Sequence, residues 1–121
     1  MRYNKAELVI VAAPGMGHLV STAEAAKRMV HRDDRLSITI LIMKLPLDSG
    51  IDEYIDSFSR SSDTTRIKLI LLPNDNVFTD VENPSFLTLF MESYVPHVRN
   101  NVKKLVDSDS PRVAGLLLDL F

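Results

Sequence analysis

One histidine stands where an apolar strand ends and a helix begins. The run Glu7 to Ala13 (ELVIVAA) is apolar and rich in β-branched residues, and Pro14 to Gly17 (PGMG) interrupts it before His18 opens a helical pattern. A strand, a glycine turn and a helix start would place His18 at the carboxyl edge of a sheet, facing a crevice. A neutral imidazole held in a cleft is suited to act as a general base.

An aspartate near the other end of the chain is the candidate partner of this histidine. Asp119 lies in the apolar run Leu116 to Phe121 (LLLDLF), where a carboxylate is costly to bury alone. An aspartate beside a histidine can hold the tautomer of the ring and stabilise the imidazolium that forms when the ring accepts a proton. We therefore expect a catalytic pair. The alternative for each residue is a capping role, in the helix start for His18 and in the next turn for Asp119.

The elements that must position this pair alternate between strand and helix. Apolar runs predict four strands, at Glu7–Ala13, Ser37–Met43, Ile67–Leu72 and Val113–Phe121. Apolar residues at helical spacing predict helices at His18–His31, around Ile51–Phe58, and from Pro84 to about Val106, the last capped by Asn83 and kinked at Pro96. The pattern predicts an α/β fold, a Rossmann-like parallel sheet with flanking helices. Right-handed crossovers favour the strand order 3-2-1-4, which makes the strands leading to His18 and Asp119 neighbours.

The composition excludes several classes of function. The 121 residues make at most one domain, and a net charge of −2 with no evident Lys/Arg cluster argues against nucleic-acid and membrane-surface binding. The chain has no cysteine, and its histidines lack metal-ligand spacing, so we expect no metal site. No apolar run approaches the ~20 residues of a membrane span, and the N-terminus does not resemble a signal peptide, so we expect a cytoplasmic protein.

Two nucleotide-binding motifs are incomplete. Gly15-Met16-Gly17 begins like a dinucleotide fingerprint, but Val20 stands where the third glycine belongs. The second predicted strand ends near Met43-Lys44, whereas a dinucleotide site would have an acidic residue there to bind the ribose hydroxyls. A P-loop would need Gly-Lys-Ser/Thr, which the sequence lacks.

Three segments resemble plant UDP-glycosyltransferases that modify small secondary metabolites. Pro14 to Thr22 (PGMGHLVST), between a strand and a helix, is similar to the N-terminal signature of that family. Phe90 to Val98 (FMESYVPHV) and Gly115 to Phe121 (GLLLDLF) also look like the family, in particular its flavonoid- and terpenoid-modifying branch. The resemblance extends along the entire chain.

The resemblance implies a two-domain fold, called GT-B, in which two Rossmann-like domains face each other. Residues 1–121 would be the incomplete N-terminal, acceptor-binding domain. His18 would deprotonate an acceptor hydroxyl with Asp119 as its charge partner, in an inverting sugar transfer to a phenolic, flavonoid or terpenoid acceptor. The donor, a UDP-sugar with UDP-glucose expected, would be a co-substrate held by an absent C-terminal domain, and no cofactor is implied.

Two departures from the family pattern accompany this resemblance. Ser21 stands where many members carry proline, and a hydroxyl there could cap the helix or face the donor. The tryptophan-containing donor signature has no counterpart, because the chain contains no tryptophan. We therefore expect that the 121 residues alone neither bind nor transfer a UDP-sugar. We also expect poor solubility, because the apolar last strand would be partly exposed to water.

The remaining expected substrate contacts surround the pair. Phe86 and Phe90 are one helical turn apart, and core packing is the alternative for one of them. Phe121 follows Asp119 by two positions, so strand alternation would put both on one face. The expected substrate-binding residues are Gly15, Met16, Gly17, Ser21, Phe86, Phe90 and Phe121. Two other classes remain open: a flavodoxin-like small-molecule-binding module without catalysis, and a catalytically idle interaction protein.

Overall fold

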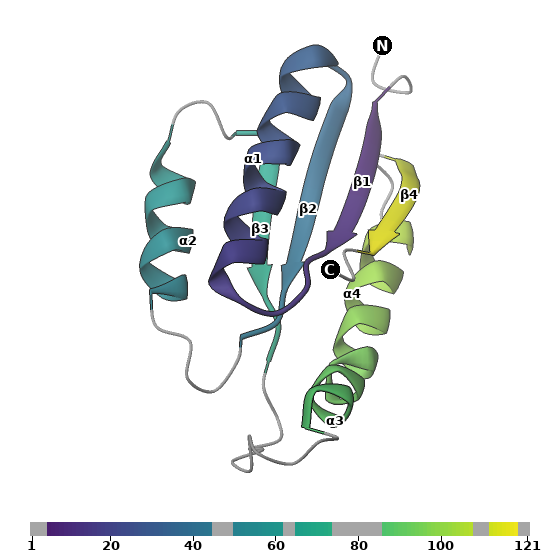
Figure 1. Cartoon of the computed structure of the whole chain (residues 1–121). Coiled ribbons are helices and arrows are strands. Elements are labelled where there is room, and N and C mark those ends of the chain that lie inside the picture. Colours follow the sequence, from purple (N-terminus) through teal and green to yellow (C-terminus); the bar gives the residue numbers. More distant parts are fainter. Residues whose placement is uncertain (1–4, 45–49, 62–64, 74–85, 108–111, 119–121) are drawn as a thin grey trace.

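The fold is a parallel sheet covered by helices on both faces (Figure 1). The computed structural model describes residues 5–44, 50–61, 65–73, 86–107 and 112–118. Its elements, in chain order, are β1 (Ala6–Val11), α1 (Met16–Arg32), β2 (Leu36–Ile42), α2 (Ile51–Arg60), β3 (Ile67–Leu71), α3 (Phe86–Ser93), α4 (Val95–Asp107) and β4 (Arg112–Leu118).

The strand order is β3-β2-β1-β4, and every pairing is parallel. The predicted fold class and strand order are therefore confirmed. β1 is a central strand, and its last residue, Val11, pairs with Leu41 on one side and with Leu118 on the other. The register between β1 and β4 shifts between Glu7 and Leu8, where β4 has one additional residue, Ala114.

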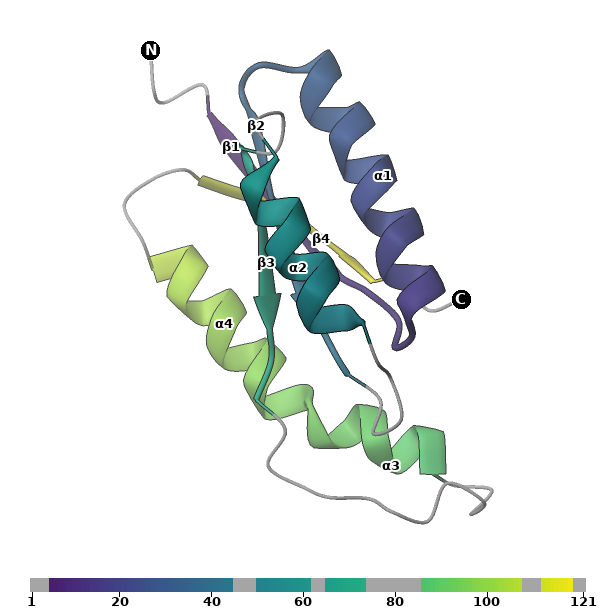
Figure 2. The same cartoon turned by 90° about the vertical axis from the view of Figure 1, so that its left-hand side faces the viewer.

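Alternation along the strands builds two apolar layers. Ile10 of β1 packs towards α1 and α2, in a core with Leu19 and Ile40, whereas its neighbours Val9 and Val11 pack towards α3 and α4. Figure 2 shows the two helical layers on opposite sides of the sheet. Near the other end of β1, on the same side as Val9, the hydroxyl of buried Thr39 donates a 2.6 Å hydrogen bond to the buried carboxylate of Glu7.

The single kinked helix predicted after Pro84 is wrong, because two helices occupy this part of the chain. α3 ends at Ser93, and α4 begins at Val95 with Pro96 as its second residue. Proline lacks the N–H that would continue the α3 ladder and disfavours helical geometry in the residue before it, but it fits a helix start. Tyr94 anchors the junction in the core at 1% exposure. The predicted cap and first residue, Asn83 and Pro84, lie outside the described residues.

One arginine ties the end of α1 to the start of β3. The Arg66 guanidinium donates hydrogen bonds to the carbonyl oxygens of Asp33 (2.7 Å), Leu36 (2.6 Å) and Val30. These groups include carbonyls that the end of a helix leaves without an intrahelical partner. In the same turn the backbone N–H of Arg35, together with its side chain, holds the pKa of Asp33 below its usual value.

Replacement of Arg66 should destabilise the fold. Arg66→Ala removes charge-assisted bonds to three carbonyls, and we expect the free energy of unfolding to fall by about 2 kcal/mol or more. Arg66→Lys should recover only part of the loss, because one ammonium cannot reproduce the planar fork. Urea unfolding followed by circular dichroism measures both. Arg60→Ala, at the exposed end of α2, is the matched control and should change stability by no more than about 0.5 kcal/mol. Equal losses at the two arginines would contradict this role.

Candidate functional site at the carboxyl edge of the sheet

The turn between β1 and α1 sets the geometry of the site. After β1, the backbone N–H of Ala12 still donates to the carbonyl of Leu41 at 3.1 Å. Gly15 then adopts φ 118° and ψ 144°, a conformation that side chains rarely allow, and α1 begins at once with Met16. The helix therefore starts two residues before the predicted His18, because the glycine turn is complete at Gly15.

His18 lies in the first turn of α1 and is partly exposed. The N-cap position belongs to Gly15, so His18 is not the cap residue, and the capping alternative for it is wrong. A β-carbon placed on Gly15 would lie 3.7 Å from Cδ2 of His18, so the imidazole sits directly against the turn. A histidine at this place lies at the carboxyl edge of the central strand, where parallel sheets bind ligands.

The neighbours of His18 on α1 divide between surface and core. Gly17 and Ser21 are exposed and one helical turn apart, so they form an open surface beside the imidazole. Met16 is half-buried and packs against the core under α1. Thr22, one helical turn after His18, is buried.

The aromatic residues predicted to contact the acceptor differ in their placement. Phe90 is 1% exposed and packs edge-on against Tyr94, with ring centroids 5.1 Å apart. Its burial favours the core-packing alternative, and acceptor contact at Phe90 stays a prediction. Asp119, Phe121 and the side chain of Phe86 lie outside the described part of the chain, so the His18–Asp119 pair also stays a prediction.

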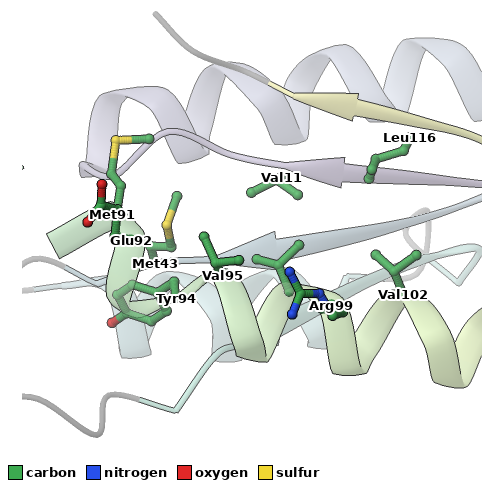
Figure 3. Close-up of a pocket in the computed structure, with 10 residues that line it drawn as sticks. Val11, Met43, Met91, Glu92, Tyr94, Val95, Arg99, Val102 and Leu116 are labelled. Atoms are coloured by element: carbon green, nitrogen blue, oxygen red, sulfur yellow. The ribbon is translucent and has the colours of Figure 1, made fainter. Parts of the chain in front are cut away.

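An apolar cavity of about 450 Å³ lies on the other face of the sheet. Figure 3 shows side chains of α4 along one wall, among them Val95 and Val102, facing Val11 and Leu116 of the sheet. Glu92 and Arg99 supply its charged groups. This cavity was not predicted from the sequence, although the spacing of valines 95, 98 and 102 predicts an apolar face on α4. The cavity suits apolar contact, whereas the partly exposed histidine that could move a proton belongs to α1 on the opposite face.

The described residues also bear on metal binding and on membranes. Among these residues no group of three or more His, Cys, Asp or Glu side chains could hold a metal ion. In the same ranges no helix has the length and apolar character needed to cross a bilayer.

Comparison with known proteins agrees with the resemblance drawn from the motifs, although no family model matches the chain. UDP-glycosyltransferase 71A15 of Malus domestica is 43% identical over 128 residues, covering 96% of this chain and 26% of that protein. UDP-glucose flavonoid 3-O-glucosyltransferase 6 of Fragaria ananassa is 42% identical over 120 residues, covering 95% of this chain and 25% of that protein.

A solved structure agrees with these sequence relatives. The crystal structure of Medicago truncatula UGT71G1 complexed with UDP-glucose matches with a TM-score of 0.78 at 35% identity, covering 96% of this chain and 25% of that one. The homologues of this chain are plant UDP-glycosyltransferases, as its motifs predicted. More particularly, the Malus domestica relative and the Medicago truncatula relative share the number 71 in their names, 71A15 and UGT71G1. The chain spans about a quarter of the length of the relatives that it matches.

The two glycines that flank Met16 should respond in opposite ways to the same substitution. Gly15→Ala forces a β-carbon onto φ 118°, and we expect a loss of about 1–3 kcal/mol in the free energy of unfolding. Gly17 lies inside α1 with open space around it, so Gly17→Ala should be neutral or stabilise by up to about 1 kcal/mol. Chemical denaturation of both variants tests the turn geometry, and similar effects at the two positions would contradict it.

Proposed function

We propose that this chain is the acceptor-binding part of an inverting, UDP-sugar-dependent glycosyltransferase, with His18 as its general base. The observation that carries the proposal is the position of His18, in the first turn of α1 directly after the central strand of a parallel sheet. The homology to plant UDP-glycosyltransferases supports the same assignment. The acceptor is a small lipophilic molecule with a hydroxyl group, and a flavonoid is the class suggested by the name of the Fragaria ananassa relative.

The chemistry is a single displacement at the anomeric carbon of the sugar. His18 accepts the proton of the acceptor hydroxyl as its oxygen attacks the anomeric carbon. The bond from that carbon to the diphosphate breaks, and UDP leaves with the bonding electron pair. The product carries the new glycosidic bond with inverted configuration, and the proton resides on the imidazole until solvent removes it.

Asp119 acts as the charge partner of His18 in this proposal. β4 ends at Leu118, which is paired with Val11 at the end of β1, and Asp119 is the next residue in the sequence. A carboxylate beside the imidazole would orient the ring and stabilise the imidazolium during transfer. The support is the register of β1 and β4 together with the sequence, since the strand that leads to His18 is the direct neighbour of the strand that leads to Asp119.

The donor in this proposal is UDP-glucose, used as a co-substrate. The Medicago truncatula relative was crystallised with this molecule. A crevice at the carboxyl edge of a doubly wound sheet needs walls on both sides, and the chain spans only a quarter of the length of its relatives. We therefore assign the acceptor side of the crevice to this chain and the donor side to a second domain.

The apolar cavity under α4 favours a second candidate, a small-molecule-binding module without catalysis. Its volume of about 450 Å³ lies within the ordinary range of ligand pockets. The two candidates differ in their dependence on His18, because an apolar binding module does not need a proton acceptor.

Substitution of the base tests the proposed mechanism. In a chimera whose first quarter is this chain and whose remainder comes from the Malus domestica relative, His18→Ala should lower kcat for glucosylation of a flavonol by roughly 10²–10⁴-fold. Asp119→Ala should cost as much or less, because part of its role is orientation. His97→Ala, on α4 beside Tyr94, is the matched histidine control and should keep the rate of the unmodified chimera. A chimera that transfers glucose equally well without His18 would overturn the mechanism and favour the binding module.

The acceptor wall can be tested in the same chimera. Phe121 follows the proposed charge partner by two positions, so we expect its ring on the acceptor side. Phe121→Ala should raise the KM for the flavonol more than the KM for UDP-glucose, because apolar contact with the acceptor is lost. Steady-state kinetics with each substrate varied in turn measures the difference. A larger rise in the KM for the donor would show that Phe121 does not line the acceptor site.

A further inference from the structure

A second cavity lies far along α1 from His18, where the end of that helix approaches the start of β3. It has a volume of about 300 Å³, and we call it the basic cavity. Its lining residues are Glu24, Lys27, Arg28, Val30, His31 and Arg66. Three permanent cations face one carboxylate, so the lining carries an excess of two positive charges even with His31 neutral, in a chain whose net charge is −2.

Two of the three cationic groups have defined partners before any ligand arrives. Nζ of Lys27 lies 3.3 Å from Oε1 of Glu24 and 5.2 Å from the centroid of the Phe58 ring, which fixes the ammonium between α1 and α2. The guanidinium of Arg66 is fixed by its bonds to three carbonyl oxygens. Those bonds use three of the five N–H donors of an arginine, so donors remain for a ligand.

The same bonds change the electrostatics of this end of α1. The carboxyl end of a helix normally repels anions, because its last carbonyls carry partial negative charge. Here Arg66 covers the carbonyls of Val30 and Asp33 with a positive group. Arg28 is exposed and makes no hydrogen bond or ion pair in the described ranges, so its guanidinium is available to a ligand.

We propose that the basic cavity binds a small anion with a terminal phosphate, held by Lys27, Arg28 and Arg66. Guanidinium and ammonium groups around one hollow match the charge and the acceptor oxygens of phosphate. The hollow shape favours a free phosphate over the headgroups of a flat membrane. The site is separate from the proposed base, since His18 lies in the first turn of α1 and His31 in its last.

Calorimetric titration of the chimera described above with sodium pyrophosphate, at low ionic strength in a buffer without phosphate and with the donor site saturated by UDP, tests the proposal. We expect saturable binding that weakens with added salt. UDP-glucose should show no saturable binding, because both of its phosphates are esterified and it offers no terminal phosphate. The double variant Lys27→Gln, Arg28→Gln should raise the Kd for pyrophosphate by about tenfold or more, as expected for lost charge-assisted hydrogen bonds.

The matched control is Lys103→Gln, Lys104→Gln, which removes two adjacent exposed lysines from α4. It should leave the Kd for pyrophosphate within about twofold of the unmodified chimera, because it changes the net charge equally but far from the cavity. Lys27 also contacts Phe58, so the single variant Arg28→Gln, checked by circular dichroism, separates lost binding from lost folding. The proposal is overturned by absent saturable binding, by equal losses in the two double variants, or by binding to phosphatidylserine vesicles without binding to pyrophosphate.

Discussion

The pairing of β1 with strands on both of its sides is the constraint on which the rest of the structure depends. Val11 pairs with Leu41 of β2 and with Leu118 of β4, so three chain segments end together at one edge of the sheet. Because all the pairings are parallel, every strand directs its carboxyl end to that edge. The turn at Gly15 then returns the chain over one face, and His18 follows within the first turn of the helix.

Much of this arrangement can be predicted from the sequence because it depends on local patterns and on chirality. Apolar runs locate the four strands to within a few residues, and right-handed crossovers favour the order that the strands adopt. The wrong predictions concern the ends of helices, where a single residue determines the boundary. Gly15 starts α1 earlier than the helical pattern indicates, and Pro96 divides what the apolar spacing suggests is one helix. The periodicity of side chains does not record such backbone events.

Features that depend on contacts between distant segments could not be predicted from the sequence. Arg66 is an isolated residue in the chain, yet it completes a cavity whose other cations lie on α1. Lys27 and Arg28 are adjacent in the sequence, but the third cation joins them only when β3 pairs beside β2 and brings Arg66 against the end of α1. The cavity under α4 is similar, since Leu116 and Val98 face each other only through the order β1-β4.

The proposed base and the basic cavity lie at opposite ends of the same helix. α1 carries the imidazole at one end and contributes to the basic cavity at the other, with a buried apolar stripe between them that includes Leu19, Ala23 and Ala26. That stripe packs on β-strands whose interior side chains are close-packed, so displacement of one end of the helix strains the other.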